Sequence, residues 1–228
     1  LRAAFAGEIG RLDGMGNHHG PHLANRESIC FAWHGWGGFS LRLGRTTLTV
    51  DPGFSPPGTY GPWHTPNRNA PGYDEYFAKF RPDYLLITHG HFDHFDIETV
   101  RRVEAGAHPT FIASRAAVDV LAGQIGVERE RLLALEPGEG ADLPASLPAS
   151  LPASLPASLP ASLPANQPFR VLAYQGVHWM TGEEGDIAAR KMARPDRYGV
   201  MPCGGPMLQY ILQTCLGHIY ISGDTLLQ

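Results

Sequence analysis

The stretch that decides the fold is THGHFDHFD, residues 88–96. It follows a short hydrophobic run at residues 84–87, so we expect it where a buried strand ends and a loop begins. It carries four candidate metal ligands: His89, His91, Asp93 and His94. Alternate side chains share a face of an extended chain, so the first three can converge on one point. If the chain then turns toward helix, His94 lies one helical turn from His91 and reaches the same pocket.

Imidazole nitrogens and a carboxylate are the ligands that suit Zn²⁺ and related divalent ions. The four side chains lie within six residues. Four ligands are too many for a single ion that keeps open positions. The pattern therefore favours two neighbouring metals, with one or two Zn²⁺ per chain and with Mn²⁺ or Fe²⁺ as alternatives. The competing interpretation is a solvated, histidine-rich turn that binds no metal.

The stretch resembles the HxHxDH signature of the metallo-β-lactamase superfamily. Upstream, residues 33–52 (WHGWGGFSLRLGRTTLTVDP) look like the opening hairpin of the branch that contains ascorbate-6-phosphate lactonase and N-acylphosphatidylethanolamine phospholipase D. Downstream, His178 and the YISGDT of residues 220–225 follow in the family's order. The resemblance implies an α/β (α+β) fold, the four-layer αββα sandwich of metallo-β-lactamase type.

The resemblance also assigns the metal ligands. It implies one set at His89, His91 and His178, and a second at Asp93, His94 and Asp224. Asp224 would bridge the two ions, because a carboxylate has two oxygens and can hold both. Without the resemblance, His178 would more often be a structural histidine at a strand end, and Asp224 a turn aspartate.

Two further roles follow from the resemblance. Asp51 stands at the end of a predicted strand, and in the family an aspartate here braces the metal loop from outside the ligand shell. The alternative for Asp51 is a turn-initiating residue before Pro52. Asp93 is the candidate catalytic residue, because it can orient the attacking water as well as bind metal. Relatives often carry histidine where this chain has Trp36, and His34 lies two positions earlier.

The periodicity and the turn residues predict the remaining elements. We expect strands near residues 29–34, 39–43, 46–50, 84–87, 110–113, 132–135, 169–177, 207–213 and 218–222. Asp96 is expected to cap a helix over residues 97–104, and Ser114 a second helix that ends near Gly123. His218 begins a strand away from the metal loop, so we interpret it as structural.

The domain organisation has two irregular segments. Residues 1–27 are rich in Gly, His and Asn and predict a flexible N-terminal arm. LPAS is then repeated five times from Leu143 and followed by LPAN, which ends at Asn166. Proline at every fourth position disfavours both helix and central strand, so residues 143–166 are interpreted as a low-complexity linker. The metallo-β-lactamase-like domain would occupy residues 28–228 around it.

Composition limits the partners. Eighteen basic and twenty-two acidic residues give a net charge of −4 at pH 7, which argues against a general nucleic-acid-binding surface. Three cysteines without CxxC spacing favour reduced thiols and a cytoplasmic location. No apolar run approaches the roughly 18 residues that a membrane span requires. The partner we expect is a small-molecule substrate.

The resemblance predicts a hydrolase in which a metal-bound hydroxide attacks a lactone or a phosphodiester. However, the chain stops four residues after Asp224, where family members continue to a last histidine of the second metal site. We therefore interpret it as truncated, with a sheet face that a homo-oligomer would cover. One alternative is a truncated, non-catalytic metal-binding domain. The others are a nuclease-like relative and a thioester hydrolase.

Overall fold

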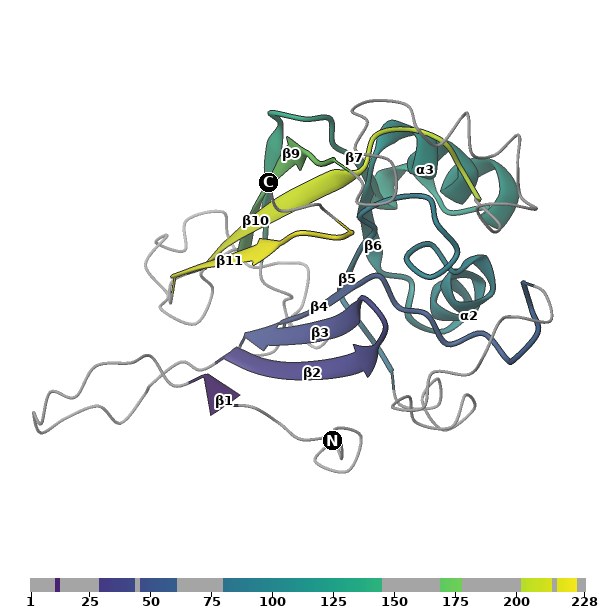
Figure 1. The fold of residues 1–228 in the computed structure, drawn as a ribbon, viewed down its shortest axis with the longest axis horizontal. Coiled ribbons are helices and arrows are strands. Elements are labelled where there is room, and N and C mark those ends of the chain that lie inside the picture. Colours follow the sequence, from purple (N-terminus) through teal and green to yellow (C-terminus); the bar gives the residue numbers. More distant parts are fainter. Residues whose placement is uncertain are drawn as a thin grey trace, which may run out of the picture.

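The structure is a computed structural model that describes residues 11–12, 29–43, 46–60, 80–144, 169–177, 202–214 and 217–224. Its described part is a mixed α/β fold in which two β-sheets pack face to face and helices cover one of them (Figure 1). The predicted α/β fold class is confirmed. None of the helices in the described ranges is long and apolar enough to cross a membrane.

The first sheet has seven strands in chain order: β1 (Arg11–Leu12), β2 (Ile29–Gly35), β3 (Gly38–Leu43), β4 (Thr46–Val50), β5 (Tyr84–Leu86), β6 (Thr110–Ala113) and β7 (Leu132–Ala134). Strands β1 to β4 pair antiparallel, whereas β4 to β7 pair parallel. The short connections after β2 and β3 give antiparallel neighbours, whereas the connections from β5 to β6 and from β6 to β7 run through helices and give parallel ones. All predicted strands of this sheet are confirmed. Strand β1 was not predicted and lies within the expected flexible arm, whose other residues are outside the described ranges.

The second sheet is antiparallel throughout, in the order β11-β10-β9-β8. Its strands are β8 (Gly140–Leu143), β9 (Phe169–Gln175), β10 (Leu208–Thr214) and β11 (Gly217–Ile221). Strand β8 was not predicted. Its last residue, Leu143, is also the first residue of the LPAS repeat, and it is buried opposite Phe169. The strand pairing therefore reaches into the first repeat.

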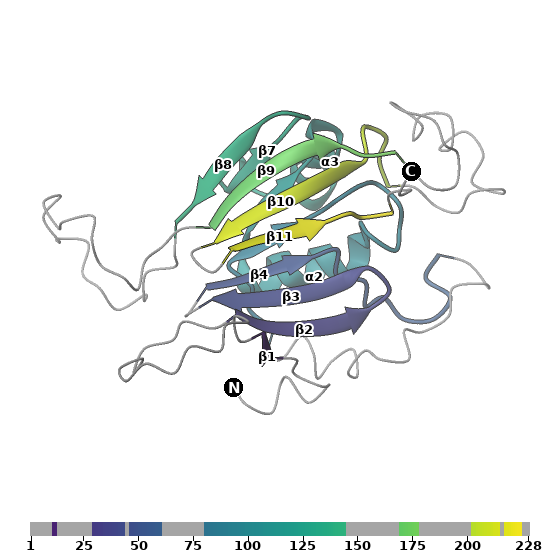
Figure 2. The same ribbon diagram turned by 60° about the vertical axis from the view of Figure 1, so that its left-hand side comes forward.

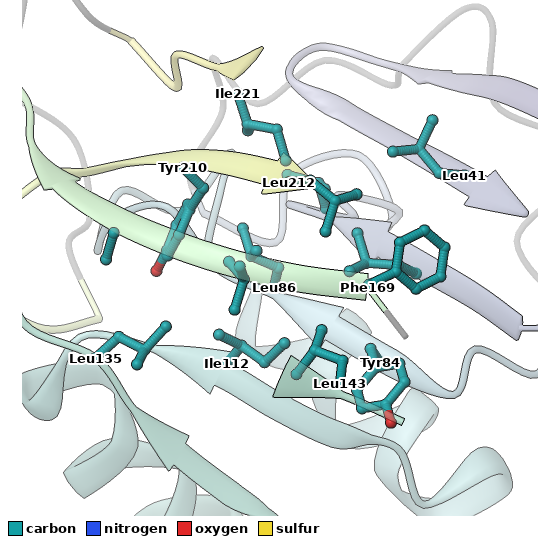
Figure 3. Close-up of a cluster of buried hydrophobic side chains, with 14 of the residues drawn as sticks. Leu41, Tyr84, Leu86, Ile112, Leu135, Leu143, Phe169, Tyr210, Leu212 and Ile221 are labelled. Carbon is teal, nitrogen blue, oxygen red and sulfur yellow. The ribbon is translucent and has the colours of Figure 1, made fainter. Parts of the chain in front are cut away.

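The main core lies between the two sheets (Figures 2 and 3). Alternation in β10 places Leu208, Tyr210 and Leu212 on the buried face, against Leu86 and Ile112 of the first sheet. Each such side chain contributes about 1.5–3 kcal/mol on burial. The hydroxyl of Tyr210 donates to the backbone carbonyl oxygen of Ile87 at 3.1 Å, which ties the second sheet to the end of β5.

The helices cover the outer face of the first sheet. Helix α2 (Ile97–Ala107) begins at the predicted cap, where the Asp96 side chain accepts from the Thr99 amide. Helix α3 (Arg115–Val120) begins at Ser114 and continues as a π-helical turn, η2 (Leu121–Ile125); a short 3₁₀ helix, η3 (Arg129–Arg131), follows. No described helix covers the outer face of the second sheet, so the described residues form three layers, α, β and β.

The carboxyl ends of the parallel strands meet at one edge of the molecule. Asp51 follows β4 directly and Thr88 follows shortly after β5. The amide of Leu208, which opens β10, donates to the carbonyl oxygen of Thr88 at 2.9 Å. Both sheets thus contribute chain to this edge, the usual place for a site in a sheet of parallel strands.

Candidate metal centre

The loop after β5 folds back on itself. The carbonyl oxygen of His91 accepts from the amide of His94 at 3.0 Å and from that of Phe95 at 2.6 Å. This single turn returns His94 to the side of His89, and the centroids of the two rings are 4.1 Å apart. Helix α2 begins only afterwards. His94 therefore reaches the pocket through a turn and not through the helix that the spacing predicted.

A side chain from the other end of the chain completes the cluster. Ligating atoms of His89, His94 and Asp224 all lie within 4.8 Å of one another. Nε2 of His94 is 3.1 Å from Oδ1 of Asp224, which follows β11. His91 adjoins the group, with its Nδ1 2.8 Å from Nε2 of His89. Asp93 adjoins it too, with Oδ2 3.9 Å from Nε2 of His94.

Five of the six predicted metal ligands are therefore close together: His89, His91, Asp93, His94 and Asp224. The sixth, His178, lies outside the described residues. The compact group joins His89 of the first predicted ligand set to His94 and Asp224 of the second. The two predicted ligand sets therefore meet at one centre, and the number of ions that it holds stays a prediction.

The donor set fits a divalent transition metal. Imidazole nitrogens together with carboxylate oxygens suit zinc, iron and manganese. The three histidines are buried, whereas the side chains of Asp93 and Asp224 are 35% and 28% exposed. The cluster is thus closed on the histidine side and reachable by solvent on the carboxylate side, as a catalytic rather than a structural site requires.

Asp51 contacts the loop from behind. Its Oδ1 accepts from the Thr88 amide at 2.8 Å, and its Oδ2 accepts from the Thr88 hydroxyl at 2.5 Å. The same Oδ2 is 2.7 Å from Nδ1 of His94, on the side of the ring opposite to the Asp224 contact. The backbone of Asp51 has a φ of 42°, a conformation that costs a non-glycine residue free energy. The three contacts to its carboxylate offset that cost.

The carboxylates determine the charge state of His94. Burial lowers the pKa of this ring, but the charges of Asp51 and Asp93 and the hydrogen bonds to Asp224 and Asp51 outweigh burial and raise the pKa well above its ordinary value. The pKa of Asp93 is raised, first by its own burial, against the opposing effect of His94. A proton between His94 and Asp224 and a metal ion at the same place therefore compete.

Comparison with known families gives one match. The family model of the metallo-beta-lactamase superfamily matches residues 41–95, from β3 to the end of the metal loop. The matched segment, which includes the metal loop, is thus similar to that superfamily. A comparison with curated proteins found no match.

Solved structures resemble the chain distantly. Igni18, a metallo hydrolase from the archaeon Ignicoccus hospitalis, shares 17% identity over 88% of this chain and 62% of its own, with a TM-score of 0.45. CmlA, a diiron beta-hydroxylase from Streptomyces venezuelae, shares 17% identity over 90% of this chain and 31% of its own, with a TM-score of 0.48. The chain thus spans 62% of the length of the Ignicoccus protein.

Asp96 has more hydrogen-bond partners than the sequence indicated. It was predicted only as a helix cap, yet its buried carboxylate accepts from six donors. These are the amides of Phe54, Ser55 and Thr99 and the hydroxyls of Ser55, Tyr60 and Thr99. The far end of the metal loop is therefore hydrogen-bonded to the segment that follows β4. No local pattern indicates these contacts, because most of the donors lie some forty residues earlier in the chain.

Gly90 is a second residue whose role the sequence did not indicate. A Cβ added here would lie 2.2 Å from the carbonyl oxygen of Cys203, so only glycine allows the segment before β10 to pack on the metal loop. Cys203 itself is buried, and burial raises the pKa of its thiol to about 12. The thiol is therefore protonated at neutral pH and packs against the loop as an apolar group.

The turn between β2 and β3 also reaches the centre. A Cβ on Gly37 would meet the His94 ring at 2.8 Å. The neighbouring Trp36 packs edge-on against Phe92, which in turn contacts Tyr60. His34 is buried elsewhere, with Nε2 2.7 Å from the Ser40 hydroxyl.

Proposed function

We propose that the chain carries the active centre of a metal-dependent hydrolase. One observation carries the proposal: buried histidines after β5 and a carboxylate after β11 converge at the edge where the parallel strands end. These side chains come from distant parts of the sequence, and burying their polar atoms together costs desolvation free energy. A cation that binds them offsets that cost, and the carboxylates leave one side accessible to a substrate.

Both predicted ligand sets enter the proposal. His89, His91 and His178 would hold one ion, and Asp93, His94 and Asp224 the other. His178 follows β9, whose end is tied to this edge: the Gly176 amide donates to the carbonyl oxygen of Met207, next to the Leu208 amide that bonds Thr88. When bound, the metal supplies a Lewis acid and lowers the pKa of water. Zinc is the first candidate, with manganese and iron as alternatives.

The protein side chains then have separate tasks. The carboxylate of Asp93 borders the cluster and is partly exposed, so it would accept a hydrogen bond from the attacking water and orient it. His94 is fixed between Asp51 and Asp224 and cannot turn away. Asp51 supports the loop from its buried side without facing the substrate.

The proposed substrate is a small lactone or phosphodiester. Hydrolysis of either needs a polarised oxygen and an oriented water, which this donor set provides together with a metal. The net charge of −4 disfavours a nucleic acid as the partner. Cys30 and Cys203 are free thiols, in agreement with the proposed cytoplasmic location.

The test is turnover with a matched pair of histidine variants. The chain, purified without chelator, would be assayed for metal content and for hydrolysis of a bis-aryl phosphodiester and an aryl lactone. His94→Ala removes a cluster member, whereas His218→Ala removes an exposed histidine of β11. We expect His94→Ala to lower kcat/KM by about 100-fold or more, and His218→Ala to leave it unchanged.

Equal activity in the two variants would contradict the proposal. Metal binding without turnover of either substrate would instead favour the alternative, a non-catalytic metal-binding domain.

A further inference from the structure

The hydroxyl of Thr88 lies among three polar atoms at the back of the cluster. Its Oγ1 is 2.5 Å from Oδ2 of Asp51, 3.0 Å from Nδ1 of His89 and 3.4 Å from Nδ1 of His94. The residue is 1% exposed, and both its backbone amide and its carbonyl oxygen are hydrogen-bonded. Thr88 is therefore held in place independently of the contacts of its side chain.

A hydroxyl has one proton to donate and lone pairs with which to accept. An ionised carboxylate only accepts, so the short contact to Asp51 takes the Thr88 proton. The hydroxyl oxygen can then only accept from His89, and Nδ1 of His89 must carry the hydrogen. His94 follows the same rule, because its Nδ1 faces Oδ2 of Asp51 and must donate to it.

We propose that Thr88 is a positioning residue that fixes the tautomer of His89. The chain Asp51–Thr88–His89 places hydrogen on Nδ1 and leaves the lone pair on Nε2, which lies 2.8 Å from Nδ1 of His91 and is the nitrogen left to bind a metal ion. Asp51 thus orients two rings, His94 directly and His89 through the Thr88 hydroxyl. Outer partners of this kind raise the basicity of the ligand and reduce its rotational freedom.

The consequence for metal binding rests on the proposed function, but the tautomer does not, because it is a property of the metal-free protein. Two-bond ¹H–¹⁵N correlation spectra distinguish Nδ1–H from Nε2–H in a neutral imidazole. They would be recorded on the metal-free chain at about pH 8.5, above the ordinary histidine pKa. The His89 signals are assigned by their absence in His89→Gln.

Three variants separate the hydroxyl from the rest of the side chain. Thr88→Val keeps the shape and removes the hydroxyl, and Thr88→Ser restores it. Thr99→Val is the matched control, because Thr99 is another buried threonine whose hydroxyl donates to a buried carboxylate, at 2.7 Å from Asp96. Zn²⁺ affinity would be measured by competition with a chromophoric chelator.

We expect Nδ1–H at His89 in the wild type and in Thr88→Ser and Thr99→Val. In Thr88→Val we expect an Nε2–H population, with Zn²⁺ affinity lower by about 10- to 100-fold than in Thr99→Val. Nε2–H at His89 in the wild type would overturn the inference without any variant. A Thr88→Val protein with the tautomer and affinity of Thr99→Val would overturn it as well.

If Thr88→Val does not fold, Thr88→Ala replaces it, and the wild-type spectrum still decides the tautomer. A chain with Nδ1–H at His89 that binds no Zn²⁺ would contradict the proposed function and leave the tautomer assignment standing.

Discussion

Asp51 and Asp96 are buried carboxylates at the two sides of one loop, and their hydrogen-bond partners belong to different parts of the molecule. Asp51 accepts from an amide, a hydroxyl and a ring that all belong to residues 88–94. Asp96 accepts from the segment after β4 and from the first turn of α2, and none of those donors is a predicted metal ligand. The same chemical group thus serves the metal centre at one end and the scaffold at the other.

The difference predicts separable effects. Loss of Asp96 should weaken folding, because several donors buried far from the metal lose their acceptor. Loss of Asp51 should weaken metal binding more than folding, because its partners include His94. A chain in which both substitutions act alike would show that the loop is a single cooperative unit.

The largest effect is expected from Asp96→Ala. Removal of this carboxylate takes an acceptor from the amide and the hydroxyl of Ser55 and from the hydroxyl of Tyr60. We expect the free energy of unfolding to fall by about 4 kcal/mol, a large part of the stability of a single domain. Urea denaturation followed by circular dichroism measures it. A loss under about 1 kcal/mol would show that water replaces the carboxylate readily.

Asp51→Asn should act on metal affinity instead. The amide side chain retains the shape but supplies one acceptor oxygen in place of two. We expect Zn²⁺ affinity to fall by about 10- to 100-fold, or about 1.4–2.7 kcal/mol. Asp83→Asn is the matched control, because Asp83 accepts from the Thr47 amide at 2.7 Å just before β5, at the opposite end of the strand from the metal loop. Equal affinities in the two variants would contradict the role of Asp51.

His34 provides the contrast to His94. Burial lowers the pKa of His34 to about 4, whereas carboxylates raise that of His94. Between about pH 4 and 6.5, His34 is protonated in the unfolded chain but neutral in the folded chain. The contribution of neutral, buried His34 to the free energy of unfolding is therefore complete above pH 6.5 and falls with decreasing pH. We expect His34 alone to contribute a loss of about 2 kcal/mol between pH 7 and pH 5, opposed in part by His94, whose raised pKa stabilises the fold as pH falls. His34→Gln should flatten that part of the profile; an unchanged profile would contradict the assignment.

The smallest effect is expected from Tyr60→Phe, which removes one of the six donors to Asp96 and retains the ring contact with Phe92. We expect a loss of about 1 kcal/mol in urea denaturation and no change in metal affinity. Tyr174→Phe, on an exposed tyrosine of β9, is the control. A change in metal affinity would show that the Asp96 contacts reach the metal centre, and would weaken the distinction between the two carboxylates.

The local pattern predicted most of this fold. Alternation marked the strands, the Asp96 and Ser114 caps marked the helix starts, and the motif supplied His89 and His94, although a turn rather than the predicted helix brings them together. Each of these signals acts within a few residues, which is the range over which side chains bias the backbone.

What the sequence did not predict depends on distant partners. Strand β8 was not predicted, and it is a strand because β9 pairs with it. The six contacts of Asp96 and the packing of Cys203 on Gly90 join segments far apart in sequence. The motif does contain Thr88, but its role appears only when Asp51 is beside it. Residues 61–79 and 178–201, which include the predicted ligand His178, lie outside the described ranges.

The most direct test of the central claim is metal content per chain in the wild type and in Asp224→Asn, with Asp142→Asn as the control. Asp224 is 3.1 Å from Nε2 of His94, whereas Asp142 is an exposed aspartate of β8 that pairs with Arg170. Elemental analysis after dialysis against Zn²⁺ should find bound metal in the wild type and in Asp142→Asn, and clearly less in Asp224→Asn. Equal metal in all three chains, or none in the wild type, would contradict a metal centre built from the loop after β5 and the end of β11.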